Sequence, residues 1–282
     1  MHWKTKAACF RLLGAIPFGG ALHFWAQKNV TRTWPRPVED INALVGVARK
    51  TVADFQRLSA KPLQKATFLE IGAGRDLAVP ITLKLLGAGS VNTIDIERLA
   101  KLDLVNAAAK MVAGALEVPA PQFASWRDLE NFGIKYAAPF DAASAPLPAI
   151  DAFVSNEVLE HVPPSALRGI FDNVARSMPV GGVSLHSIDY SDHYARGGGV
   201  SRYHFLQFSE GEWHPYNSGM HYVNRLRHSQ YVRVMMDAGF AVIDEDTYAE
   251  DLPTGMVIAP EFKNFDPADL RVMRARICAV KP

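Results

Sequence analysis

Short apolar runs alternate with longer segments of helical periodicity along most of the chain. Apolar residues recur at helical spacing in five segments, and this predicts helices at residues 38–58, 77–86, 99–116, 164–178 and 228–238. Short apolar or alternating runs predict strands at residues 67–71, 90–96, 134–138, 150–155, 183–189, 240–246 and 270–280. The pattern contains no internal repeat.

Strands that alternate with helices indicate an α/β fold with a doubly wound, Rossmann-like sheet of seven mostly parallel strands. The run at 270–280 follows the strand at 240–246 without an obvious crossover helix. Parallel neighbours need such a crossover, so we expect the last strand to insert antiparallel.

Pro62 ends the first long helical segment and divides the chain into an N-terminal helical extension, residues 1–62, and a main domain, residues 63–282. Residues 190–228 lack clear periodicity and are rich in aromatic residues, which predicts an ordered lid over an active site. The mostly apolar segment at residues 7–27, called the leader below, is interrupted by Arg11 and broken by Pro17 and Gly19. We therefore expect a docked helix-turn-helix cap. A membrane-surface or partner-binding segment, and a signal or anchor, are the alternatives.

Composition favours a globular protein with a sizeable core, since 49% of the 282 residues are hydrophobic and 21% are charged. A net charge of +1 argues against broad electrostatic binding of nucleic acid. Cys9 and Cys278 form neither a disulfide framework nor a zinc motif. These features predict a cytoplasmic protein, with membrane association as the alternative, and leave its oligomeric state open.

The segment at residues 67–76 combines a buried strand with an acidic residue and a tight turn. Gly72 and Gly74 let the backbone approach a ligand closely, and Glu70 places a carboxylate at the strand end. This arrangement suits a ligand with an ammonium group and ribose hydroxyls. It suits a pyrophosphate poorly, because the glutamate repels anions.

Further polar residues end the next strands in order. Asp95 is placed to accept two ribose hydroxyls, Asp141 to accept from an adenine amino group, and Asn156 lies in the loop after the fourth strand. Each residue also has a structural alternative. The two glycines would serve a bare turn, Asp95 a helix N-cap, and Asp141 a turn cap.

The ordered motifs Glu70–Gly74, Asp95, Asp141, 155–162 and 179–182 resemble those of class I S-adenosylmethionine-dependent methyltransferases. The resemblance covers residues 67–189 and implies a seven-stranded sheet with an antiparallel last strand. It implies S-adenosyl-L-methionine as the cofactor, with the methionine part at the first motif and the sulfonium near Asn156. The implied cofactor-binding residues are Glu70, Gly72, Ala73, Gly74, Asp95, Ile96, Asp141, Ala142 and Asn156.

A hydroxyl acceptor would benefit from a general base, and polar residues follow the fourth and fifth strands. We predict His161, Asp192 and His193 as catalytic residues, with Asp189 as a further candidate. The alternative role of His161 is packing on the next helix, and the alternative for the segment around His193 is a solvated loop. We predict no metal, because the adjacent side chains of Asp192 and His193 diverge in extended backbone.

The lid supplies candidates for binding the acceptor. Tyr203 and Trp213 offer faces for sugars or flat rings, while Arg225 and Arg227 offer bidentate donors. The alternative is a structural lid, in which the aromatics fill its own small core and the arginines satisfy carbonyls. Patterns in this segment weakly resemble methyltransferases of polysaccharide and glycolipid assembly.

The leading hypothesis is a methyltransferase that O-methylates a small-molecule or glycan hydroxyl. Its expected partners are this acceptor and no nucleic acid, with weak membrane-surface contact through the leader as an option. Two alternatives stay open. One is an NAD(P)-dependent oxidoreductase, which the missing third glycine of the dinucleotide fingerprint and Glu70 disfavour. The other is an inactive methyltransferase fold that serves as a partner protein.

Overall fold

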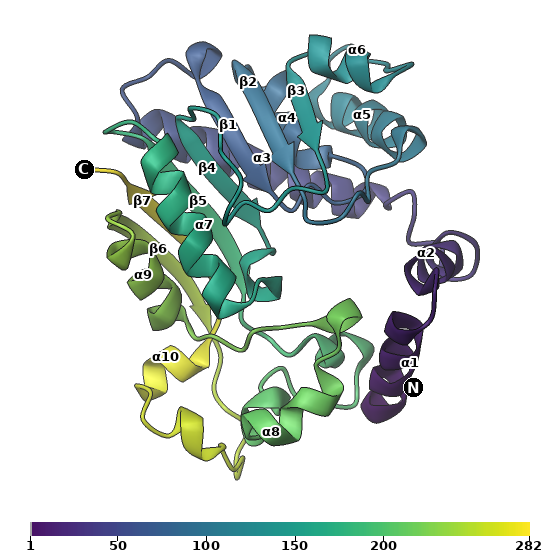
Figure 1. Cartoon of the computed structure of the whole chain (residues 1–282), viewed down its shortest axis with the longest axis vertical. Helices are drawn as coiled ribbons and strands as arrows, with labels where there is room; N and C mark the ends of the chain where they lie inside the picture. Colours follow the sequence, from purple (N-terminus) through teal and green to yellow (C-terminus); the bar gives the residue numbers. More distant parts are fainter. Residues whose placement is uncertain (1) are drawn as a thin grey trace.

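A seven-stranded sheet forms the centre of the protein in a computed structural model that describes residues 2–282 (Figure 1). The strand order is β3-β2-β1-β4-β5-β7-β6. The strands are β1 (Thr67–Ile71), β2 (Ser90–Ile94), β3 (Ile134–Ala137), β4 (Ala152–Asn156), β5 (Val183–Asp189), β6 (Ala241–Ala249) and β7 (Val272–Val280).

The direction of the strands confirms the predicted fold class. Strands β1 to β5 are mutually parallel, while β7 inserts between β5 and β6 and is antiparallel to both. The last strand begins at Val272 rather than at residue 270, because residues 267–271 form the short helix α10 (Pro267–Arg271). Pro267 starts this helix, and Asp266 caps it by accepting from the Ala268 N–H. The sequence predicted neither α10 nor the short helix α6 (Trp126–Asn131).

Helices cover both faces of the sheet and bury its central strands β1, β4 and β5 (Figure 1). One face packs against α3 (Val38–Leu58), α4 (Ala78–Leu85) and α5 (Leu102–Leu116). The other face packs against α7 (Pro164–Ser177) and α9 (His228–Asp237). This double cover explains why the central strands read as nearly continuous apolar runs.

Helix α3 is an integral layer of the core. Its apolar stripe includes Ile41 and Phe55, which are fully buried, and the ring of Phe55 lies 5.0 Å from that of Phe68 on β1. On the same helix, Asp54 accepts from Arg276 of β7 at 2.7 Å. The helix therefore links the segment before residue 62 directly to the sheet.

The leader folds as two helices, of which the first docks on the lid. Helix α1 (Trp3–Ala15) and helix α2 (Gly19–Asn29) are joined at Phe18, and α1 lies beside the lid (Figure 1). Trp3 is buried among lid aromatics, with its ring centroid 4.5 Å from His204 and 4.7 Å from Tyr216. No helix within residues 2–282 is long and apolar enough to span a membrane.

Candidate active site

The Gly72–Gly74 turn is held in place by bonds to β2. The Gly72 N–H donates to the Ile94 carbonyl at 2.9 Å, and the Gly74 N–H donates to Oδ2 of Asp95 at 3.1 Å. Both glycines adopt positive φ, 80° and 66°. The turn and Asp95 therefore form one unit at the carboxyl edge of the sheet, where parallel α/β sheets bind ligands.

Glu70 is a buried carboxyl group with no cationic partner within residues 2–282. Its one side-chain hydrogen bond comes from the Thr93 hydroxyl at 2.6 Å. Burial, reinforced by the nearby Asp95 and Asp76, raises the pKa of Glu70 to about 8. A buried carboxyl group in this setting is stabilised as an anion by a bound cation.

A small cavity of about 210 Å³ opens beside Glu70. It is lined by the glycine turn, Asn156 and Glu157, and by residues that the motif did not indicate, Arg36, Leu44, Asp76, Ala78 and Val79. Arg36 bonds the buried Asp76 at 2.8 Å, and Asp76 in turn accepts from the Ala78 N–H. Arg36 and Asp76 thus brace the loop that follows the Gly72–Gly74 turn. The only sign of this contact in the sequence is the opposite charge of the two residues, which lie forty positions apart.

A larger cleft of about 1490 Å³ extends from Asp95 to His161 beneath the leader and the lid. Oδ1 of Asp95 accepts from the Glu97 N–H at 3.2 Å. No helix begins there, so Asp95 is not a helix cap. Burial raises the pKa of Asp95 above its ordinary value. Ile96 lines the same cleft and is 66% exposed, so it offers an apolar face beside the carboxylate.

Asp141 caps a turn, which is the structural alternative that the sequence analysis gave for it. Its oxygens accept from the Ala143 N–H at 3.0 Å and from the Ser144 hydroxyl at 2.6 Å. These bonds lower the pKa of Asp141. The carboxylate lines neither of the two cavities described, and Ala142 beside it is buried. Asp141 and Ala142 therefore lack the direct support that the geometry gives to Glu70 and Asp95.

His161 and His193 come together at the far end of the cleft, with ring centroids 4.9 Å apart. His161 keeps an exposed edge and bonds the Tyr222 carbonyl through Nδ1 at 2.7 Å. Withdrawal from water inside the cleft lowers the pKa of His161. The imidazole is therefore neutral at pH 7, as a base must be.

Asp192 faces away from this pair. It accepts from the Tyr194 N–H at 2.8 Å and lies 2.9 Å from Nδ1 of His204 in the lid core. The carboxylates that do approach His193 and His161 are Asp189, 3.6 Å from His193 Nε2, and Glu160. Sequence order alone put Asp192 beside His193, but neighbouring side chains diverge. Glu160 gave no sequence signal beyond its place before His161.

The four predicted acceptor-binding residues lie inside the lid, as the structural alternative described. Tyr203 and Trp213 are buried in the lid core, and the Tyr203 hydroxyl donates to the Glu250 and Arg271 carbonyls. Arg225 donates to the carbonyls of residues 205 and 208, and Arg227 to those of residues 190 and 272. Their polar groups are used internally, and the cleft is lined instead by lid residues 214–215 and 217–222.

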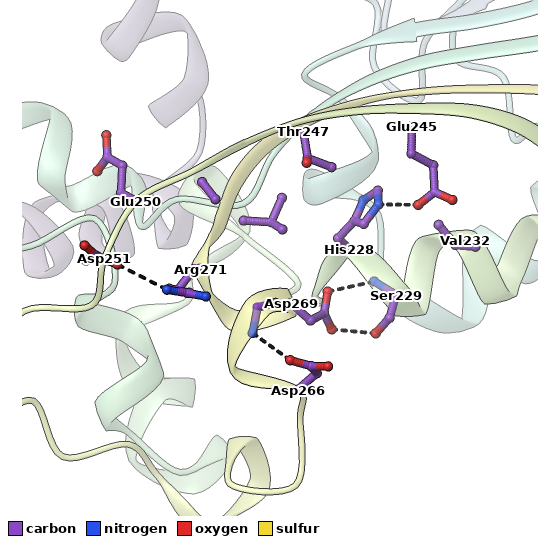
Figure 2. A pocket seen from close by; sticks show the side chains of 13 residues that line it. His228, Ser229, Val232, Glu245, Thr247, Glu250, Asp251, Asp266, Asp269 and Arg271 are labelled. Atoms are coloured by element: carbon purple, nitrogen blue, oxygen red, sulfur yellow. Dashed lines mark hydrogen bonds and ion pairs between the residues drawn. The ribbon is translucent and has the colours of Figure 1, made fainter.

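A separate hollow of about 1040 Å³ lies near the β6 edge, between α9 and α10. Figure 2 shows that its polar groups bond one another: His228 pairs with Glu245 at 2.6 Å, and Ser229 donates to Asp269. None of the predicted site residues lines it. The predicted residues that line a cavity are Glu70, Gly72, Ala73, Gly74 and Asn156 in the small cavity and Asp95, Ile96 and His161 in the strand-end cleft.

Comparison with known proteins gives no family assignment. No family model and no curated protein matches the chain. Similar folds occur in magnesium protoporphyrin IX methyltransferase from Synechocystis PCC 6803, with 14% identity, a TM-score of 0.47, and coverage of 99% of this chain and 94% of that one. A putative methyltransferase from Bacillus halodurans has 14% identity, a TM-score of 0.48, and coverage of 83% and 99%. Likeness at this level does not decide activity or substrate.

Proposed function

We propose that the protein is an S-adenosyl-L-methionine-dependent methyltransferase. The observation that carries the proposal is the pairing of Glu70 with Asp95 across the Gly72–Gly74 turn. A buried carboxyl group without a cation suits the ligand's ammonium group, and the second carboxylate suits a ribose diol. Exposed Ile96 then offers an apolar surface to the adenine ring.

The proposed reaction is O-methylation of a hydroxyl on a small molecule or glycan. The acceptor oxygen attacks the methyl carbon in line, the carbon–sulfur bond breaks, and sulfur keeps the electron pair. The protein's main tasks are alignment and exclusion of water. The cleft exceeds the roughly 300–1,000 Å³ typical of small-molecule sites, which leaves room for an acceptor beside the cofactor. His161 and His193 are placed to accept the proton of the hydroxyl.

Calorimetry with S-adenosylhomocysteine tests this function directly, and a parallel titration with NADH tests the oxidoreductase alternative. We expect binding of the first ligand only, because the turn lacks the third glycine of the dinucleotide fingerprint and the Asp95 carboxylate beside Gly74 would repel a pyrophosphate. A wild-type protein that binds NADH and not S-adenosylhomocysteine would refute the proposal. Binding of the cofactor without turnover on a panel of hydroxyl acceptors would favour the inactive partner protein.

Cofactor binding should release a proton at mildly acidic pH. The free carboxyl group of Glu70 has a pKa of about 8 and so holds its proton at pH 6, whereas pairing with the ligand's ammonium group requires the anion. Affinity should therefore rise with pH between about 5.5 and 7, where the ligand's α-amino group, of pKa about 7.7–8.0, stays charged. Calorimetry in two buffers of different ionisation enthalpy measures this release. Equal heats in both buffers would contradict the prediction, and Glu70→Gln is the matched control without a titrating group.

We also propose that the leader rests on an anionic membrane surface. Leu22 and Trp25 lie three residues apart on one side of α2 and are 50% and 57% exposed, and Phe18, just before the helix, is 87% exposed. Residues 2–38 carry six lysines and arginines and no acidic residue. Apolar side chains flanked by positive charge are typical of helices that lie in the interface of anionic bilayers.

Replacing Phe18 and Trp25 by serine should weaken binding to vesicles of phosphatidylglycerol and phosphatidylcholine by about 100-fold. Burying each ring in the interface contributes roughly 1.5–3 kcal/mol. Vesicle sedimentation measures the loss, and Val180→Ser is the control because Val180 is 76% exposed outside the leader. The absence of wild-type binding to these vesicles, or dimerisation through the same residues, would refute the membrane proposal.

A further inference from the structure

Glu160, His161 and His193 form a compact cluster where the lid meets the sheet. Glu160 and His161 belong to the short helix η2 (Leu159–His161) after β4, and His193 begins the short helix η3 (His193–Gly197) after β5. Each side chain offers one ligand atom, and these atoms all lie within 4.8 Å of one another. His161 also lines the large cleft.

Glu160 is the member of the cluster that lacks partners. The residue is 1% exposed, and its Oε2 has no hydrogen bond. Oε1 accepts a single long bond of 3.4 Å from the Asp189 N–H. The nearby guanidinium of Arg196 bonds Asp189 at 2.9 Å and does not pair with Glu160. A buried carboxylate oxygen is costly unless a cation or donor satisfies it, so this oxygen marks a place for one.

The two histidines are held as metal ligands usually are. Nδ1 of His161 donates to the Tyr222 carbonyl, which leaves Nε2 with its lone pair. Nε2 of His193 lies between Arg196, at 3.1 Å, and Asp189, at 3.6 Å. Arg196 can only donate, so Nε2 of His193 accepts from it and holds a lone pair, while the ring proton lies on Nδ1. Nε2 is therefore the ligand atom, and Arg196 keeps its bond to Asp189 when an ion takes its place.

We propose that Glu160, His161 and His193 bind a divalent transition-metal ion such as Zn²⁺. One carboxylate with two imidazoles is a donor set suited to zinc and its first-row neighbours rather than to Mg²⁺ or Ca²⁺. Tetrahedral ligands at about 2.1 Å from zinc lie roughly 3.4 Å apart, so the three ligand atoms, now within 4.8 Å of one another, move together by up to about 1.4 Å around the ion. This inference departs from the sequence analysis, which predicted no metal.

A third imidazole lies near the cluster. His221 has a buried Nε2 without a hydrogen-bond partner, and its ring centroid lies 6.2 Å from that of His193. Burial lowers the pKa of His221 to about 3, so this ring is neutral. It is placed to bond a water or acceptor oxygen that completes the coordination of the ion.

The role of the ion rests on the proposed methyl transfer. The acceptor hydroxyl would occupy an open coordination position facing the cleft, where the ion lowers its pKa. The proton passes to water, the oxygen–carbon bond forms as the carbon–sulfur bond breaks, and no group is oxidised or reduced. The metal thus supplies the activation that a sugar-like hydroxyl needs and a phenolate does not.

Titration of the chelator-treated protein with Co²⁺ tests the site without reference to activity. We expect a single Co²⁺ per chain, visible absorption bands of low-coordinate cobalt, and their loss on addition of Zn²⁺. Glu160→Gln and His193→Ala should each weaken binding by at least about 100-fold, since each removes a direct ligand. His214→Ala is the matched control, because His214 lines the same cleft outside the cluster.

Binding of S-adenosylhomocysteine to each variant separates loss of the metal from loss of the fold. A wild type that binds this ligand but not Co²⁺ or Zn²⁺ would overturn the metal proposal and leave the imidazoles as bases. Equal metal affinity in His214→Ala and His193→Ala would overturn the ligand assignment. Failure to bind S-adenosylhomocysteine while Co²⁺ binds would refute the proposed function and retain the metal site.

Discussion

Asp95→Ala should weaken binding of S-adenosylhomocysteine by about 100-fold or more. The carboxylate is proposed to accept two ribose hydroxyls, and hydrogen bonds to a charged group contribute roughly 1.5–3 kcal/mol each. The substitution also removes the acceptor that holds the Gly74 N–H at 3.1 Å, which loosens the turn around the ligand. Calorimetry on the purified variant measures the change in Kd.

Two controls assign the effect to the carboxylate of Asp95. Asp95→Asn keeps an acceptor for the Gly74 N–H but loses the charge. Its affinity for S-adenosylhomocysteine should therefore lie between those of the wild type and Asp95→Ala. Glu97→Ala removes the exposed neighbouring carboxylate in the same cleft and should bind as the wild type does. Equal affinity of Asp95→Ala and the wild type would exclude Asp95 from the cofactor site.

Gly72→Ala should destabilise the fold by about 3 kcal/mol. An alanine Cβ would lie 2.3 Å from Cγ2 of Val158, and the residue holds φ at 80°. Overpacking of this kind costs about 1–3 kcal/mol, and a left-handed conformation costs a residue with a side chain about 1–2 kcal/mol. Equilibrium unfolding in urea, followed by circular dichroism, measures the free-energy change.

Gly74→Ala is the matched control because it shares the positive φ, 66°, but has no atom within 4 Å of the new Cβ. It should cost only about 1 kcal/mol. In Gly72→Ala/Val158→Ala, the steric part of the loss should be recovered, which appears as favourable coupling in a double-mutant cycle. Equal losses in the two single variants would show that the close approach of Val158 has no energetic effect.

The position of the residues proposed to bind the cofactor was largely predictable from sequence, because each of them lies at the end of a strand. The carboxyl ends of β1, β2 and β4 must meet at one edge of a parallel sheet, so Glu70, Asp95 and Asn156 are brought together by strand order alone. Asp141 shows the limit of this reasoning. It also follows a strand, yet local bonds to Ala143 and Ser144 occupy its carboxylate.

The acceptor end was not predictable in the same way. Arg225 and Arg227 were chosen for residue type, but burial in the lid turned both toward backbone carbonyls. A loop segment lacks the fixed periodicity that tells which side chains face inward. Trp213 likewise fills the lid core instead of the cleft.

The sequence by itself determined the sheet, its antiparallel last strand and the Glu70–Asp95 unit, because periodicity and turn chemistry act over a few residues. Only the tertiary structure decided that His193 rather than Asp192 faces His161, and that Glu160 is buried beside them without a partner for Oε2. Those contacts join separate loops through the packing of the lid on the sheet. No local pattern fixes them, since their energy comes from burial and charge among residues distant in sequence.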